Sequence, residues 1–161
     1  MKFSPQTIPD VLLIEPVIHR DERGYFVETF KQKLLDEALG YQVNFIQDNE
    51  SKSTSKGVLR GLHYQLPPYT QNKLVRVIKG EILDVAVDIR RDSPTFGKYV
   101  SVVLSEKNKK QLFVPGGFAH GFIVLSEGAT FAYKVDAYYS AEHEEGIAYN
   151  DKDLDIDWRF I

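Results

Sequence analysis

The stretch QLFVPGGFAHGFIVLS, residues Gln111–Ser126, contains two short apolar runs separated by small residues and a proline. Runs of this length that are rich in Val, Ile, Leu and Phe, and bounded by Gly, Pro, Asn or Ser, are typical of β-strands. We therefore predict one strand in QLFVPG and a second in HGFIVLS.

The same pattern continues on both sides of this stretch. Further predicted strands are residues 11–18, 24–30, 43–49, 58–65, 73–80, 81–89, 98–105 and 129–139. Residues 31–40 instead have a helical apolar stripe that includes Leu35, and Gly40 is placed to end that helix. Many short strands at roughly 8–12-residue spacing, with one short helix, predict an all-β sandwich, jelly roll or barrel. With no repeat or linker visible, residues 1–161 are expected to form a single domain.

The overall composition narrows the classes of function. The 161 residues carry a formal net charge of -3 and no basic stripe interleaved with aromatic residues, so we expect no nucleic-acid partner. The absence of cysteine excludes disulfides, thiolate metal sites and a cysteine nucleophile. No apolar run reaches the length of a membrane span, and residues 1–10 do not resemble a signal peptide. A cytoplasmic location without a membrane partner is therefore expected.

The four histidines, which are His19, His63, His120 and His143, bear on metal binding. The segment PGGFAH, which ends at His120, has the P-x-G-x-x-H spacing of the second half-motif of cupins. Metal-binding cupins carry H-x-H and a glutamate in the first half-motif, whereas this chain has HYQLPPY from His63 onward. Two imidazoles without a nearby carboxylate make a poor zinc or iron site, so we expect no metal.

His63 lies in GVLRGLHYQ, residues 57–65, and the residues alone leave two interpretations open. It is either a core histidine bonded to a backbone carbonyl or a base, because neutral imidazole accepts a proton near neutral pH. In a regular strand Arg60 and His63 face opposite sides of the sheet. A bulge at Gly61 would bring both side chains to one site.

Several separated motifs occur in the order found in one enzyme family. They extend from Ile14 to Trp158 and include DERGYFVETF, FIQDNESKS, RGLHYQ, KLVRVIKG, DVAVDIRRDSPTFG, QLFVPGGFAHGF, YKVDAYY and YNDKDLDIDW. On these motifs the chain resembles the dTDP-4-dehydrorhamnose 3,5-epimerase family. The resemblance implies a cupin-type jelly roll (double-stranded β-helix), a homodimer that exchanges an N-terminal strand, and no metal or coenzyme. It also implies epimerisation of dTDP-4-keto-6-deoxy-D-glucose at C3 and C5 to dTDP-4-keto-L-rhamnose, for cell-surface polysaccharide.

The resemblance also implies a role for individual residues. The protons at C3 and C5 flank the C4 ketone, so the reaction requires a base, a group that stabilises the enolate oxygen, and an acid. By resemblance His63 is the base, Lys73 holds the enolate oxygen and Tyr133 is the acid. The expected substrate-binding residues, among which Tyr139 stacks on thymine, are Arg23, Glu28, Gln47, Asp48, Asn49, Arg60, His120, Tyr139 and Glu144.

The C-terminal part of the sequence departs from the family pattern. Members usually continue past the DW motif with a Ser-x-Lys-Asp segment whose Asp pairs with the catalytic histidine, whereas this sequence ends in DWRFI. We therefore expect the family's C-terminal extension to be absent. Asp84 falls on the polar face of its predicted strand and is the alternative candidate for orienting His63.

Three other functions compete with this interpretation. An epimerase that inverts only C3 or only C5 of a dTDP-4-keto-6-deoxy sugar would use the same histidine, lysine and tyrosine. A 3,4-ketoisomerase typically carries a second histidine soon after the first, where this chain has Gln65, which argues against that reaction. A sugar-nucleotide binding protein without turnover is the alternative from a different class.

Overall fold

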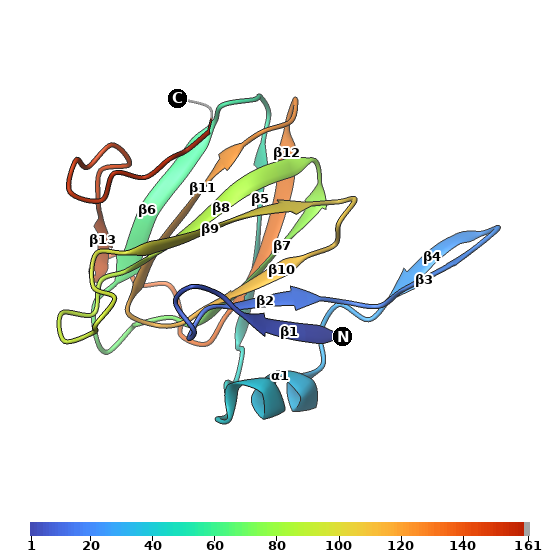
Figure 1. The fold of residues 1–161 in the computed structure, drawn as a ribbon, viewed down its shortest axis with the longest axis horizontal. Coiled ribbons are helices and arrows are strands. Elements are labelled where there is room, and N and C mark those ends of the chain that lie inside the picture. The colour runs from blue at the N-terminus through green and yellow to red at the C-terminus, as the bar shows by residue number, and fades with distance from the viewer. Residues whose placement is uncertain (160–161) are drawn as a thin grey trace.

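Two antiparallel sheets face each other and form the body of the molecule (Figure 1). The structure is a computed structural model that describes residues 1–159. The six-stranded sheet has the order β1 (Lys2–Pro5), β2 (Leu12–Glu15), β10 (Gln111–Val114), β7 (Lys73–Lys79), β12 (Ala129–Val135) and β5 (Gln47–Ser53). The five-stranded sheet has the order β13 (Glu144–Gly146), β6 (Leu59–Gln65), β11 (Phe118–Val124), β8 (Glu81–Asp88) and β9 (Tyr99–Ser105). The predicted all-β class is confirmed.

The hydrophobic core lies between the two sheets. Val75 and Phe131 of the six-stranded sheet pack in one cluster with Ala86 and Phe122 of the five-stranded sheet, and all four are at most 4% exposed. The other face of the five-stranded sheet is also covered, because Trp158 packs over residues of β8 and β11. Strand β8 is therefore buried on both faces, which explains why it reads as an almost continuous apolar run.

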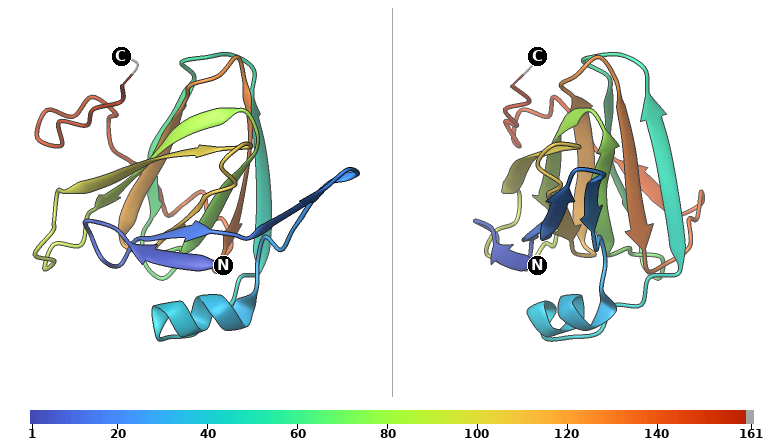
Figure 2. Two further views of the ribbon diagram at one scale, coloured as in Figure 1. Left: turned by 45° about the vertical axis from the view of Figure 1, so that its right-hand side comes forward. Right: turned by 90° about the vertical axis from the view of Figure 1, so that its right-hand side faces the viewer.

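A two-stranded hairpin projects away from both sheets (Figures 1 and 2). It consists of β3 (Ile18–Asp21) and β4 (Gly24–Val27), and we call it the arm. The arm exposes Tyr25 and Phe26, whose relative exposures are 53% and 64%. The predicted strand 11–18 contains β2 but only the first residue of β3, because the ladder of β2 ends before Pro16 and proline lacks the N–H that a sheet ladder needs.

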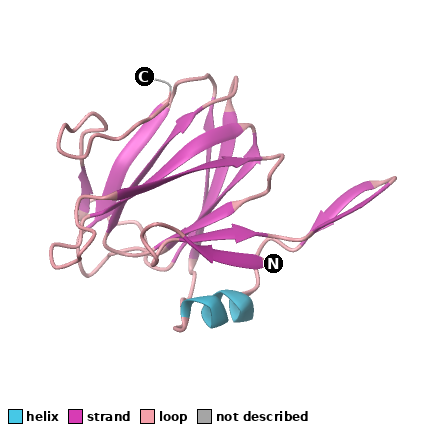
Figure 3. Ribbon diagram, in the orientation of Figure 1, coloured by secondary structure: helices cyan, strands magenta, loops and turns pink. Residues whose placement is uncertain are grey.

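Helix α1 (Gln32–Leu39) lies next to the six-stranded sheet, and Figure 3 shows it in cyan. Its buried residue Leu35 packs in a cluster with Leu12 and Phe113. The helix ends at Gly40, as predicted, where φ is +78° and the N–H bonds to the carbonyl of Asp36 at 2.8 Å. No helix among residues 1–159 is long and apolar enough to cross a membrane.

A buried ion pair fixes the loop between β8 and β9. The carboxylate of Asp88 is 0% exposed and accepts bonds from Arg90 at 2.9 and 3.0 Å and from the hydroxyls of Ser93 and Thr95. Burial raises the pKa of Asp88, but these hydrogen bonds outweigh it and hold that pKa well below its usual range. Arg90 also reaches Asp10 at 2.8 Å, which ties this loop to the N-terminal segment.

Asp88→Asn is expected to lower the free energy of unfolding by about 2–3 kcal/mol at pH 7, since it leaves part of the Arg90 network unpaired. Because the native pKa of Asp88 is depressed, its stabilising contribution is present above the unfolded pKa of about 4 and is lost as the pH falls below it. Urea unfolding should therefore show that the free energies of unfolding of Asp88→Asn and the unaltered protein differ less at pH 3 than at pH 7. The exposed neighbour variant Asp92→Asn is the control, and an equal loss in both variants would contradict this role.

Candidate active site

A cavity of about 490 Å³ lies between the two sheets. Its lining includes residues from β5, β7 and β12 of the six-stranded sheet and from β6 and β13 of the five-stranded sheet. It brings together eight of the predicted site residues, which are Gln47, Asp48, Asn49, His63, Lys73, Tyr133, Tyr139 and Glu144. His63 and Tyr133 come from opposite sheets, so a ligand in the cavity would lie between them.

A bulge in β6 determines which way His63 faces. His63 pairs with His120 of β11 and Arg60 pairs with Phe122, so two residues of β6 oppose the single residue Gly121. This register confirms the bulge predicted at Gly61, whose φ is +119°. With the bulge, Leu59 and Leu62 pack on the covered outer face, which leaves Arg60 and His63 on the inner face.

The close approach of β6 and β11 requires glycine on both strands. A Cβ atom added at Gly61 would lie 2.6 Å from the Cα of Gly121 and 2.7 Å from the carbonyl oxygen of His120. A Cβ atom added at Gly121 would lie 2.7 Å from the carbonyl oxygen of Arg60. Neither position has room for a side chain, and the backbone beside His63 is fixed by this contact.

The electrostatics of the cavity favour a neutral histidine beside a charged lysine. The pKa of His63 lies below its usual value because of partial burial, and Lys73, His120 and Arg60 add positive charge that lowers it further, against the opposing effect of Glu144. Burial lowers the pKa of Lys73 to about 8, although Asp84 and Glu144 favour its charged form. At neutral pH His63 is therefore a free base and Lys73 an ammonium ion.

Asp84 contacts a different histidine from the one expected. Its Oδ1 lies 2.8 Å from Nε2 of His120, and the carboxylate is 0% exposed on the inner face of the five-stranded sheet. Its Oδ2 is buried and has no hydrogen-bond partner among residues 1–159. The prediction that Asp84 orients His63 is therefore not supported by the geometry, and within residues 1–159 the His63 ring makes no hydrogen bond with the protein.

Several of the residues predicted to bind the nucleotide lie around the segment that follows β12. Tyr139 is 57% exposed, and its hydroxyl donates to Glu144 Oε2 at 2.8 Å. The side chains of Gln47 and Asn49 are joined by a hydrogen bond of 2.8 Å, and Gln47 Oε1 also accepts from the N–H of Tyr139 at 3.4 Å. These contacts form a polar rim with one exposed aromatic ring.

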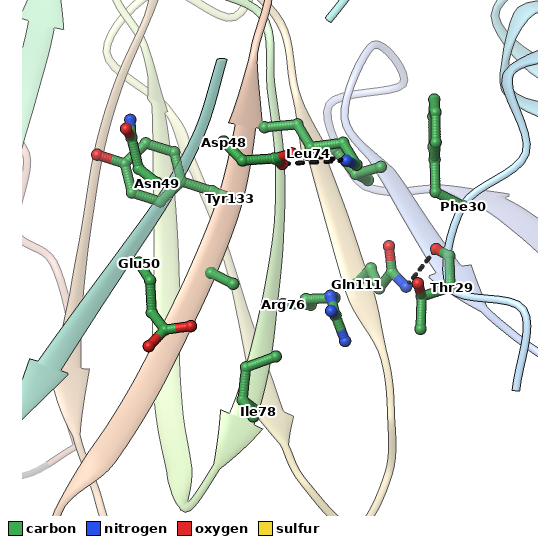
Figure 4. A pocket seen from close by; sticks show the side chains of 12 residues that line it. Thr29, Phe30, Asp48, Asn49, Glu50, Leu74, Arg76, Ile78, Gln111 and Tyr133 are labelled. Atoms are coloured by element: carbon green, nitrogen blue, oxygen red, sulfur yellow. Dashed lines mark hydrogen bonds and ion pairs between the residues drawn. The ribbon is translucent and has the colours of Figure 1, made fainter. Parts of the chain in front are cut away.

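A second cavity, of about 350 Å³, lies on the outer face of the six-stranded sheet beside residues 29–30 (Figure 4). Leu74 and Arg76 line it, whereas Val75 between them faces the core. Asp48 also contributes to this outer cavity and pairs with Lys134 at 3.0 Å. Its carboxylate is therefore engaged on the outer face, although its strand borders the inner cavity as well.

Four predicted residues are not in the lining of the cavity of their own chain. Arg23 is at the turn of the arm and pairs with Asp21, while Glu28 follows β4 and pairs with Lys31. Arg60 and His120 lie on neighbouring strands beside His63 rather than in the lining of the cavity itself.

Sequence reasoning missed other residues of the lining, including Gln65 and Gln71. The two-residue period of a strand was a usable signal for Gln65, since it falls on the same face as His63. No cluster of three or more His, Asp or Glu side chains suited to a metal ion occurs within residues 1–159.

The chain is similar to known proteins in both sequence and structure. The model of the family described as dTDP-4-dehydrorhamnose 3,5-epimerase matches residues 5–161. The enzyme of that name from Shigella flexneri is 61% identical over 98% of this chain and 87% of its own length. The structure of dTDP-6-deoxy-D-glucose-3,5-epimerase from Legionella pneumophila, in complex with dTDP-4-keto-L-rhamnose, superposes with a TM-score of 0.94 at 54% identity, over 98% of this chain and 82% of that one.

A mono-epimerase has the same fold at lower identity. ChmJ, a 3'-monoepimerase from Streptomyces bikiniensis in complex with dTDP-quinovose, has a TM-score of 0.88 and 34% identity, over 94% of this chain and 76% of that one. The predicted cupin-type jelly roll with one short helix is confirmed by this set of structures.

Proposed function

This chain belongs to the dTDP-4-dehydrorhamnose 3,5-epimerase family, and from that premise we propose that it epimerises dTDP-4-keto-6-deoxy-D-glucose at C3 and C5 to dTDP-4-keto-L-rhamnose. The observation that carries the proposal is the placement of His63 and Tyr133 on opposite sheets across one cavity, with Lys73 in the same lining. Inversion needs this arrangement, because a proton leaves one face of the sugar and another arrives at the opposite face.

The electrostatics support the role of each group. The lowered pKa of His63 keeps its imidazole free to remove a proton from the carbon next to the C4 ketone. The resulting enolate carries negative charge on its oxygen, and in this proposal the Lys73 ammonium stabilises that charge. Tyr133, which lies across the cavity from His63, then returns a proton to the carbon. These steps are redox-neutral proton transfers, which the three side chains can perform without a coenzyme.

The nucleotide half of the substrate is proposed to bind along the rim of the cavity. Tyr139 offers an exposed ring for the thymine base, and Glu144 holds its hydroxyl. Arg60 supplies positive charge for the diphosphate through charge-assisted hydrogen bonds. The remaining polar residues assigned to substrate binding are Gln47, Asp48, Asn49 and His120.

We also propose a homodimer in which the arm of one copy completes the cavity of the other. Arg23 lies in the turn of the arm, which projects from the sheets in Figure 1, and Glu28 directly follows the arm; neither residue lines the cavity of its own chain. The arm exposes Tyr25 and Phe26, which are apolar surfaces that a second copy would bury. A partner's arm would thereby bring Arg23 and Glu28 to the nucleotide.

The proposed product indicates the biosynthetic pathway in which the enzyme acts. An activated L-rhamnose precursor serves rhamnose biosynthesis, and we place its use in cell-surface polysaccharide. We propose that residues 1–161 act as one catalytic domain in the cytoplasm, with the sugar nucleotide and a second copy of the chain as partners.

Deuterium uptake tests the reaction directly. Incubated with dTDP-4-keto-6-deoxy-D-glucose in heavy water, the protein is expected to introduce two deuterons, at C3 and C5, because each inverted carbon takes its new proton from the solvent-exchanged acid. Mass spectrometry counts them and NMR locates them. One deuteron would replace the proposal with a mono-epimerase, as in ChmJ. No deuteron, with dTDP still bound, would identify a binding protein without turnover.

Tyr133→Phe is the matched variant for this experiment, since it removes a single oxygen atom. Proton removal by His63 should continue, whereas return of a proton to the opposite face should fail. We expect net inversion to fall at least about tenfold more than wash-in of deuterium at the original configuration. An equal loss of both would show that Tyr133 is not the returning acid.

A further inference from the structure

The segment between β12 and β13, residues 136–143, carries Tyr139 but belongs to neither sheet. Side-chain amides from the chain before β7 hold its first part. Asn72 bonds to both carboxylate oxygens of Asp136, through its backbone N–H at 2.7 Å and its side chain at 2.6 Å. Gln71 donates to the carbonyl of Ala137 at 2.9 Å. The order of this segment therefore depends on groups outside it.

Gln65 holds the part of the segment that brackets Tyr139. Its amide N–H groups donate to the carbonyls of Tyr138 at 3.2 Å and Tyr69 at 2.7 Å, and its Oε1 accepts from the N–H of Ser140 at 2.9 Å. One side chain is thus bonded to the backbone on both sides of Tyr139. Gln65 is only 7% exposed and both of its amide hydrogens are engaged, so it has no free donor for a ligand.

The Tyr139 ring itself has little other support. More than half of the residue is exposed, and its hydroxyl bonds to Glu144, which lies on a short exposed strand. The direction in which the ring projects is therefore set by the backbone of residues 138–140. That backbone is the part to which Gln65 is bonded.

We propose that Gln65 is a positioning residue, which fixes the Tyr139 ring as the platform for the nucleobase and so governs affinity for the nucleoside part of the substrate. The inference rests on the proposed function, in which Tyr139 stacks on thymine. Gln65 acts through the segment and not on the reacting carbons. Its loss therefore reduces binding that is equal in ground and transition states, and this raises KM without changing kcat.

The test compares Gln65→Met with the isosteric Gln65→Glu. A carboxylate can still accept from Ser140 but cannot donate to the two carbonyls, so both variants should weaken dTDP binding about five- to tenfold by calorimetry. Inorganic pyrophosphate, which lacks the base, should bind to both variants with the same affinity as to the unaltered protein. Thermal melting of each variant establishes that it is folded, and Gln42→Met, at an exposed glutamine, is the control.

A double-mutant cycle with Tyr139→Ala shows whether Gln65 acts through the ring. Tyr139→Ala alone should weaken dTDP binding roughly 5- to 150-fold, the range for loss of one base–aromatic stack. Adding Gln65→Met should then cost almost nothing more, since the ring that it positions is gone. Additive losses, an equal loss of pyrophosphate affinity, or a fall in kcat would each overturn the proposal.

Failure of the proposed function would give a different result. It would show as absent deuterium uptake by the unaltered protein, or as dTDP affinity that does not change in Tyr139→Ala. If the unaltered protein takes up deuterium and Tyr139→Ala weakens dTDP binding, unchanged dTDP affinity in both Gln65 variants would refute the positioning role alone.

Discussion

His63→Ala should lower the rate of deuterium exchange at C3 and C5 by about 10²–10⁴-fold, the usual effect of removing a general base. Binding of dTDP should remain close to that of the unaltered protein. The His63 ring is exposed to the cavity and makes no hydrogen bond within residues 1–159, so its removal leaves no buried partner unsatisfied. Exchange followed by NMR and dTDP affinity measured by calorimetry separate the two effects.

The alanine variant also allows chemical rescue. It leaves space beside the sugar, and added imidazole should restore part of the exchange, with a rate that follows the concentration of neutral imidazole. Parallel loss of exchange and of dTDP affinity, without rescue, would show that His63 supports the structure of the cavity and is not a base.

Lys73→Met should lower kcat/KM by about 10²–10³-fold, which is the effect of removing one group that stabilises an oxyanion. Its pKa of about 8 also gives the unaltered enzyme a basic limit, because activity falls as the ammonium loses its proton. On the acid side, activity should persist to below the usual histidine pKa, since that of His63 is lowered. A profile of kcat/KM against pH tests both limits.

The same variant should be more stable than the unaltered protein at pH 7. A shift from 10.5 to about 8 corresponds to a burial cost of up to about 3 kcal/mol, which methionine does not incur. Below pH 8 the lysine is protonated in both native and unfolded chains, and the full cost is present. Between pH 8 and 10.5 the unfolded chain binds more protons, so the stability of the unaltered protein rises and the difference narrows.

Lys79→Met, at the exposed end of the same strand, is the control for this pair of measurements. It should leave kcat/KM unchanged and alter the free energy of unfolding by no more than about 0.5 kcal/mol. A Lys73→Met variant that is less stable at pH 7 would show that the lysine contributes favourable contacts in the native state that exceed the cost of its burial.

Local patterns in the sequence were sufficient to predict most of the strands and the helix. The apolar runs located the central strands, and Gly40 marked the end of α1. The sequence missed β1, β13, β3 beyond Ile18 and β5 beyond Asn49, because these are strands at sheet edges without a buried apolar face. The predicted strand 129–139 was too long, since residues 136–139 continue its aromatic composition after the ladder has ended at Val135.

For the candidate site too, local sequence predicted some features, whereas others depend on contacts between distant segments. Strand phase and the glycine at position 61 were sufficient to anticipate that Arg60 and His63 share a face. The partner of Asp84 could not be anticipated, because it depends on β8 lying next to β11, which are far apart in the chain. Similarly, the resemblance named Arg23 without indicating that the arm carries it away from its own cavity.

The paired glycines at positions 61 and 121 also limit how this protein can evolve. Any other residue at either position adds a Cβ atom that would lie 2.6–2.7 Å from backbone atoms of the facing strand, so substitutions here cannot shift the strand that carries His63 in small steps. We therefore expect changes in substrate range to arise from substitutions outside this pair of strands.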